Sequence, residues 1–124
     1  MPRHNKYNVS PPAERTWKLR TYASKAEMEY ARLLNAIMVL EKNIAFIREQ
    51  PRIELGLPEN IYVPDFAVWY VGEDKPMFID VKGMETPAFR RAKKLWAKYG
   101  PGRLRIIKRR GKKFVCTEEI GANQ

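Results

Sequence analysis

Apolar residues recur at helical spacing in two parts of the chain. The first part runs from Ser24 to about Lys42, where apolar side chains form one stripe at intervals of three or four residues. Ser24 is placed to cap this segment, and Glu27 stands at the reciprocal position of a capping box. The second part runs from Pro87 to Tyr99 and is followed directly by a Gly-Pro-Gly stop. The pattern therefore predicts two helices.

The segments between and after these helices are rich in β-branched and aromatic residues, which is typical of strands. The expected strands cover residues 44–55 with a bend at Pro51, 61–71, 77–82, 104–107 and, after a charged turn at 108–113, a short piece at 114–117. Residues 72–76 form a hairpin turn, so the strand at 77–82 should pair back against its predecessor in antiparallel fashion. The predicted order is helix, three strands, helix, strand.

The chain of 124 residues is long enough for one domain with a modest core. We expect a basic N-terminal arm at residues 1–20, because this part contains three prolines and no regular hydrophobic period. The arm either lies along a phosphate backbone or is disordered. The folded domain should span residues 21–117, and residues 118–124 should form a flexible tail.

Composition excludes several classes of protein. No apolar run approaches the roughly 20 residues that cross a bilayer, and the first residues lack the apolar core of a secretory signal. We therefore expect a cytoplasmic protein with no membrane partner. A single cysteine, Cys116, and a single histidine, His4, cannot form an internal disulfide or a Cys/His metal site. Serine-type and cysteine-type catalytic triads are equally unsupported.

Positive charge is concentrated in the second half of the chain. The formal net charge is +10, and residues 82–113 hold thirteen Lys or Arg against one acid, Glu85. Such a block favours a polyanion, because each neutralised phosphate releases counterions. RNA binding of the ribosomal type, or a merely solvated surface, would also fit the charge. The candidate nucleic-acid contacts are Arg90, Arg91, Lys93, Lys94, Lys98, Lys108, Arg109, Arg110, Lys112 and Lys113.

Two carboxylates and a lysine directly precede this basic block. Asp80 and Lys82 point to the same face of one expected strand, because strand side chains alternate. The hairpin then carries Asp65, on the neighbouring strand, towards Asp80. Magnesium prefers carboxylate oxygens together with substrate phosphate and water, and a nearby amine can position or deprotonate the attacking water. The competing interpretation is chance, because Asp-x-Lys is common in any lysine-rich chain.

Glu27 is a further candidate because of its place on the first helix. At about 100° per residue it falls close to Leu34 on the apolar stripe, whereas Glu29 falls on the opposite, solvent side. A carboxylate on a buried stripe is costly unless it is capped, paired or bound to a cation. Glu27 therefore either joins a metal site or serves only as the partner of Ser24 in the capping box.

This order of elements and residues resembles the PD-(D/E)xK nuclease superfamily. More narrowly, residues 15–110 look like a small phage and prophage family of predicted endonucleases, through Ser24-Lys25-x-Glu27, Gln50-Pro51, Tyr62-Val63-Pro64-Asp65-Phe66 and Ile79-Asp80-Val81-Lys82-Gly83. The resemblance implies an α/β (α+β) fold with a restriction-endonuclease-like core. In that core a mixed central sheet is flanked by helices.

The resemblance also implies roles for particular residues. Glu27, Asp65 and Asp80 would be ligands of Mg²⁺, which Mn²⁺ would replace, and the carbonyl of Val81 would be a further ligand. Lys82 would activate the water. Gln50 would assist near the metal, although a glutamine at a strand end is as often a partner of the backbone.

Three functions follow as hypotheses. The first is a magnesium-dependent endonuclease that hydrolyses DNA, encoded by a phage and acting in the host cytoplasm, with branched DNA as a suitable substrate. A homodimer would let two sites cut two strands. The second is a non-catalytic DNA- or RNA-binding module, in which the carboxylates only pair with Lys and Arg. The third is a nuclease subunit that cuts only within a recombination or packaging assembly.

Overall fold

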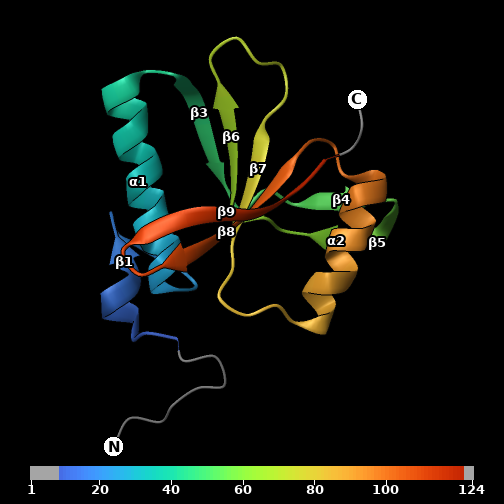
Figure 1. Ribbon diagram of the computed structural model, residues 1–124, viewed down its shortest axis with the longest axis horizontal. Helices are drawn as coiled ribbons and strands as arrows, with labels where there is room; N and C mark the ends of the chain where they lie inside the picture. The colour runs from blue at the N-terminus through green and yellow to red at the C-terminus, as the bar shows by residue number, and fades with distance from the viewer. Residues whose placement is uncertain (1–8, 122–124) are drawn as a thin grey trace, which may run out of the picture.

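The computed structural model describes residues 9–121 and arranges them in three layers, with a central sheet between two helices (Figure 1). The helices are α1 (Lys25–Glu41) and α2 (Pro87–Tyr99), and a 3₁₀ turn, η1 (Pro12–Arg15), precedes them. The strands are β1 (Thr16–Trp17), β2 (Arg20–Thr21), β3 (Ile44–Glu49), β4 (Ile53–Leu55), β5 (Leu57–Tyr62), β6 (Phe66–Tyr70), β7 (Met77–Val81), β8 (Leu104–Arg110) and β9 (Lys113–Ile120). Within this part of the chain neither helix is long and apolar enough to cross a bilayer.

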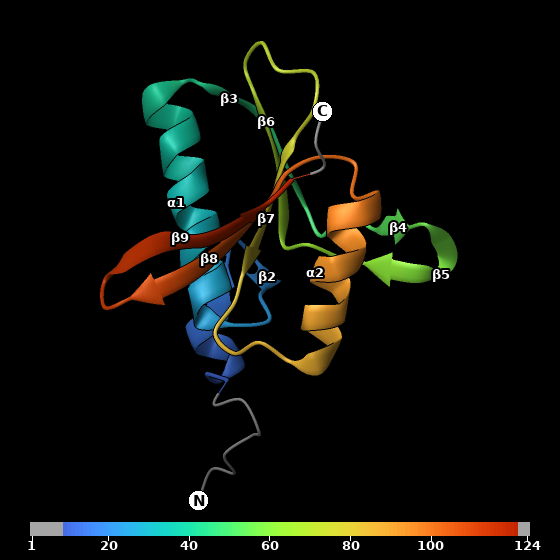
Figure 2. The same cartoon turned by 45° about the vertical axis from the view of Figure 1, so that its right-hand side comes forward.

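The central sheet has five strands in the order β3-β6-β7-β8-β9. Its β7 and β8 strands run parallel, because the connection between them passes through α2, and its other neighbours are antiparallel. Figures 1 and 2 show α1 on one face of this sheet and α2 on the other. The expected α+β fold is confirmed. A mixed central sheet flanked by helices is consistent with a restriction-endonuclease-like core.

Both predicted helices are confirmed, and side-chain caps fix where each begins. The backbone N–H of Glu27 donates to Oγ of Ser24 (3.0 Å), and that of Phe89 donates to Oγ1 of Thr86 (3.1 Å). The first helix ends at Lys42, which takes a left-handed conformation (φ 57°). Both helices begin at the end of the sheet where β7 finishes (Figure 2).

Alternation along the central strands divides the core into two halves. On β6, Phe66 and Val68 pack in the cluster beneath α1, whereas Ala67 belongs to the cluster beneath α2. On β7, Ile79 lies on the α1 side, and Phe78 lies on the α2 side with Trp96. By the same alternation, the second-last residue of β7 and the residue after the strand lie on the α2 side. This places the expected Asp-x-Lys pair at the end of the sheet and next to α2.

Two of the predicted strands are interrupted in the structure, so their predicted lengths were wrong. The segment 44–55 breaks at Gln50, which has a positive φ of 52°, so β4 leaves the central sheet and pairs with β5 in a separate hairpin. The segment 61–71 breaks before Asp65. Pro64 has no N–H to donate, and the Asp65 carboxylate accepts the N–H of Val81 in place of a backbone carbonyl.

Both ends of the domain are more ordered than expected within the described range. The predicted turn at 108–113 shrinks to Gly111 and its neighbour, since β8 and β9 extend on either side. The flexible tail expected from residue 118 is wrong up to Ile120, because this residue is part of β9 and pairs with Leu104.

The N-terminal arm expected at residues 1–20 is wrong from residue 12 onwards, because η1 and the β1-β2 hairpin fold there. Arg15, the last residue of η1, stabilises this region, because its guanidinium donates hydrogen bonds to the carbonyls of Ser10 and Tyr22. Arm residues 1–8 and tail residues 122–124 lie outside the described part.

Candidate active site

Four of the predicted site residues meet at the end of β7, each delivered by a different local structure. Glu27 lies in the first turn of α1, and Asp65 lies in the link that leads into β6. Asp80 is the second-last residue of β7, and Lys82 follows the strand. We call the three carboxylates the acidic cluster. Residues separated by more than fifty positions in the sequence therefore form one site.

Short contacts join the members of this site. Oδ2 of Asp65 accepts the backbone N–H of Val81 (2.8 Å), which fixes the carboxylate beside the end of β7. The Asp65 carboxylate also lies near Glu27, because its charge raises the pKa of the Glu27 carboxyl group. Nζ of Lys82 lies 3.6 Å from Oδ2 of Asp80. The arrangement is a chain of groups, from Glu27 through Asp65 to Asp80 and Lys82.

Burial makes the charged forms of the acidic cluster costly. Glu27 is 3% exposed and Asp80 is 2% exposed. Burial, followed by the charge of Asp65, raises the pKa of Glu27 to about 8. Burial also raises the pKa of Asp80 to about 7, although Lys82 and the backbone of Asp65 oppose the shift. The pKa of Asp65 is raised by burial as well. The cluster therefore requires a proton or a cation to offset its negative charge.

The donor set fits a divalent cation of the hard type, because carboxylate oxygens are the ligands that Mg²⁺ and Mn²⁺ prefer. Oδ2 of Asp80 is buried and has no hydrogen-bond partner within residues 9–121, so it is an oxygen without a donor of its own. In the same range no three His, Cys, Asp or Glu side chains already surround a point where a cation could sit. A cation bound here would take the place of the proton that the raised pKa keeps on Glu27.

Lys82 is held between the acidic cluster and α2. Its ammonium group lies 4.5 Å from the centre of the Phe89 ring, as well as 3.6 Å from Asp80. The side chain is 28% exposed, so the ammonium group can also reach a ligand from solvent. The Lys82 ammonium group, held in this position, can contact both a phosphate and a water molecule next to the acidic cluster.

Gln50 and Val81, the two remaining candidates, are placed beside the cluster through their backbones. The N–H of Gln50 donates to the carbonyl of Asp65 (2.9 Å), while its side chain is exposed. Val81 is buried, and its N–H is the donor to the Asp65 carboxylate. The roles of the Gln50 side chain and of the Val81 carbonyl stay predictions.

Sequence reasoning missed three residues that border the cluster. The hydroxyl of Tyr22 donates to Oε1 of Glu49 (2.7 Å), and Nε of Arg20 lies 2.9 Å from Oε2 of the same carboxylate. The charge of Arg20 also lowers the pKa of Glu27, against the larger effects that raise it. A signal for Glu49 was present, because an antiparallel strand that ends opposite Phe66 must end beside Asp65. No comparable pattern marks Arg20 or Tyr22.

The predicted basic residues form two groups, one on α2 and one on the β8-β9 hairpin. Five are on α2, and the other five are on β8, β9 and the turn between them, which reaches over α1 (Figure 2). Lys93 and Lys108 pair with Glu85, Lys93 also pairs with Glu118, and Arg109 pairs with Glu29. Among described residues no ion pair engages the other seven: Arg90, Arg91, Lys94, Lys98, Arg110, Lys112 and Lys113.

The raised pKa of Glu27 predicts how the stability of the metal-free protein depends on pH. From about pH 5 to pH 8 the folded protein keeps a proton that the unfolded chain has lost, so the free energy of unfolding should fall as pH rises. The slope should approach about 1.4 kcal/mol per pH unit for one retained proton. Urea denaturation at several pH values measures it. Glu27→Gln should lower this slope, and the remainder should come from Asp80, whose pKa burial raises to about 7. Glu41→Gln, at the exposed end of the same helix, should leave the slope unchanged. Equal curves for wild type and Glu27→Gln would contradict this assignment.

The fold and the site define a small α+β protein with a buried carboxylate cluster and a lysine at the end of its central sheet. The chain belongs to the family described as "Protein of unknown function (DUF1064)", whose model matches residues 5–114. This match spans every candidate residue of the site. No curated protein and no solved structure matches the chain.

Proposed function

We propose that this protein is a magnesium-dependent endonuclease of the PD-(D/E)xK type that hydrolyses phosphodiester bonds of DNA. The observation that carries the proposal is the meeting of Glu27, Asp65, Asp80 and Lys82 at one end of the sheet, with the carboxyl groups buried. Buried carboxylates that crowd together are costly in a purely structural role. They are useful where a cation and a phosphate must be held.

Each residue has a distinct task in this mechanism. The acidic cluster and the Val81 carbonyl would hold Mg²⁺, which supplies polarisation of the scissile phosphate and a more acidic water. Nζ of Lys82 orients the attacking water and offsets charge on the phosphate oxygens. The water oxygen forms a bond to phosphorus and loses a proton to solvent, while the bond to the leaving oxygen breaks in line and that oxygen takes up a proton from solvent. Gln50 assists beside Asp65, to whose carbonyl its backbone is bonded.

Charge and the position of α2 support nucleic acid as the substrate. The helix begins four residues after Gly83, and Lys82 lies over the ring of Phe89 in its first turn. Arg91 of the same helix lines a cavity together with Lys82. Helix N-termini and unpaired cations both favour phosphate groups. On α2 these cations are Arg90, Arg91, Lys94 and Lys98, which makes this helix the better candidate for following a DNA backbone.

The finer parts of the proposal rest on the resemblance to phage and prophage endonucleases. We expect the protein to act in the cytoplasm, of the host if a phage encodes it, and to prefer DNA structures over sequences. A homodimer would bring two acidic clusters to two strands. Within a larger recombination or packaging assembly the same site would cut only when the assembly forms.

One observation favours a second function, a non-catalytic module that binds DNA or RNA. The groups of the site already offset one another in part, because Lys82 lies 3.6 Å from Asp80 and the Val81 N–H donates to Asp65. In that case the carboxylates would only balance nearby cations. Removing Asp65 would then leave affinity for nucleic acid unchanged or make it tighter.

The Asp65→Asn variant separates the two functions. Asparagine keeps an oxygen that can accept the Val81 N–H, so the fold should be preserved while the charge is lost. For an endonuclease, calorimetric titration with Mn²⁺ at pH 8 should give heat for wild type and little for Asp65→Asn. Plasmid nicking in Mg²⁺ should fall by at least about 100-fold. Asp74→Asn, in the exposed turn between β6 and β7, is the matched control and should behave as wild type. Equal Mn²⁺ heat in wild type and Asp65→Asn would support the binding module.

A further inference from the structure

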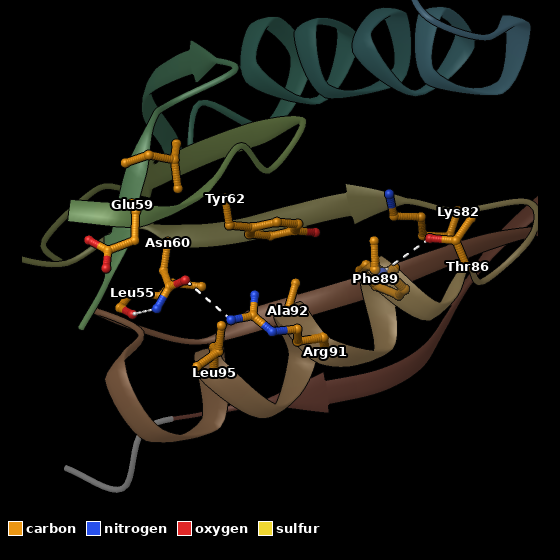
Figure 3. Close-up of a pocket in the computed structure, with 12 residues that line it drawn as sticks. Leu55, Glu59, Asn60, Tyr62, Lys82, Thr86, Phe89, Arg91, Ala92 and Leu95 are labelled. Carbon is orange, nitrogen blue, oxygen red and sulfur yellow. Dashed lines mark hydrogen bonds between the residues drawn. The ribbon is translucent and has the colours of Figure 1, made fainter. Parts of the chain in front are cut away.

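A cavity of about 350 Å³ lies between the β4-β5 hairpin and α2, and Lys82 stands at one end of it (Figure 3). Its volume is at the lower end of the range for small-molecule sites, roughly 300–1,000 Å³. Figure 3 shows Thr86 and Phe89 at the Lys82 end, with Leu55 and Asn60 towards the other. The cavity therefore opens beside the lysine that faces the acidic cluster.

A buried hydroxyl lines this cavity without a hydrogen-bond partner. Oη of Tyr62 makes no hydrogen bond within the described part of the chain, although the atom is shielded from solvent. The ring is fixed by Trp96, at 5.9 Å between centroids and nearly perpendicular, and by Phe89 at 6.3 Å. Such a hydroxyl costs about 1–3 kcal/mol relative to a satisfied one. In Figure 3 it points along the cavity towards Lys82, so a ligand that displaced the side chains covering it would supply the missing partner.

An amide and a guanidinium face each other across the same cavity. Nη2 of Arg91 donates to Oδ1 of Asn60 (3.3 Å), and Nδ2 of Asn60 donates to the carbonyl of Leu55 (3.4 Å). Both distances are long for hydrogen bonds, so a ligand with its own donors and acceptors can replace them at little cost. An amide that presents one donor and one acceptor side by side matches the edge of a nucleobase.

We propose that this cavity holds one unpaired nucleobase of the DNA strand that is cut, on the nucleotide adjoining the scissile phosphate. The proposal rests on the proposed endonuclease function. A base carries a flat aromatic face for the Tyr62 ring, polar edges for Asn60 and Arg91, and a sugar-phosphate that would extend towards Lys82. The nearby cations suit its phosphates. A base inside an intact duplex cannot enter, so the substrate class is DNA with an unpaired or extruded nucleotide.

The test replaces one nucleotide at a time by an abasic analogue around the cleaved bond of a single-stranded or flapped substrate. For wild type in Mg²⁺, kcat/KM should fall by at least about fivefold at one position next to the scissile phosphate. Analogues at distant positions should have little effect. If no position shows a loss while wild type cuts the intact substrate, the pocket proposal is overturned and the endonuclease function stands.

Two variants show whether the lost base was held in this cavity. Tyr62→Phe removes only the unpartnered hydroxyl, and Ala92→Leu fills space on the α2 side. Each should lower kcat/KM on the intact substrate, and the difference between intact and abasic substrates should shrink. Tyr99→Phe and Ala97→Leu, on the same helix but outside the cavity lining, are matched controls and should keep the full difference. Variants that keep the full difference at both cavity positions would overturn the proposal.

A binding measurement in Ca²⁺ keeps this inference separate from the cleavage claim. An oligonucleotide with an unpaired 2-aminopurine at the sensitive position, or at each position in turn, should change fluorescence on binding wild type and much less on binding Ala92→Leu. This signal without any cleavage would uphold the pocket and contradict the endonuclease function. No difference between wild type and Ala92→Leu would overturn the pocket. Unfolding in urea should show Tyr62→Phe to be at least as stable as wild type.

Discussion

Replacing Asp80 with alanine is expected to lower cleavage of DNA in Mg²⁺ by at least about 1,000-fold. The same change should leave the folded protein as stable as wild type at pH 8, or more stable by about 1 kcal/mol. The loss of cleavage and the unchanged or higher stability have the same cause. Asp80 is 2% exposed and one of its oxygens has no hydrogen-bond partner among the described residues, so the side chain is costly for folding. That oxygen is available for a cation.

Asp74→Ala is the matched control, because it removes an aspartate from an exposed turn at the opposite end of the same hairpin. Cleavage of a supercoiled plasmid and urea unfolding should be measured on the three proteins after identical purification. Asp74→Ala should match wild type in both. If Asp80→Ala kept full activity, or lost activity only because it unfolded, the proposed role of Asp80 would be wrong.

The second large effect is expected from Lys82→Gln, which should reduce the rate of cleavage by at least about 100-fold while DNA is still bound. Lys82 contributes one cation among many, so affinity for DNA measured in Ca²⁺ should change by no more than about a few-fold. The separation of rate from affinity follows from its position. The ammonium group is held between Asp80 and Phe89, at the acidic cluster.

Lys82→Arg tests what the ammonium group supplies. Arginine keeps the charge but is planar and bulkier, so its donors should not reach the position from which Nζ of Lys82 orients the water, and it should not restore the rate. Lys75→Gln, in the exposed hairpin turn, controls for the loss of one positive charge and should cleave as wild type does. An equal loss of affinity and rate in Lys82→Gln would instead make Lys82 a simple phosphate contact.

Local patterns in the sequence were enough to predict how the main site residues are placed. Strand alternation put Asp80 and Lys82 on one face, and the structure pairs them across 3.6 Å. The helical period put Glu27 on the apolar stripe, and its side chain is almost fully buried against Asp65. The predicted hairpin turn implied that β6 and β7 pair in antiparallel fashion, and this is confirmed. These relations depend on spacing within single elements or between adjacent ones.

Relations set by tertiary packing could not be predicted in the same way. Nothing near Tyr22 marks it as a partner of Glu49, because the contact depends on how η1 and the first hairpin fold against α1. The number of charges in the sequence does not show that Lys93 pairs with two acids while the neighbouring Lys94 does not. The cavity was equally hidden, since Asn60 and Tyr62 fell within or beside strands predicted as continuous. Their separate hairpin follows from breaks at Gln50 and Pro64.

The most direct test of the acidic cluster as a metal-dependent nuclease site is a cleavage assay on matched linear, single-stranded, flapped and four-way DNA. Wild type and Asp80→Ala should be compared on every substrate, with Mg²⁺ and with EDTA. Wild type should cut at least one of them in Mg²⁺, EDTA should stop the reaction, and Asp80→Ala should be inactive on every substrate. Cleavage that survives EDTA, or that is equal in wild type and Asp80→Ala, would contradict this role of the acidic cluster.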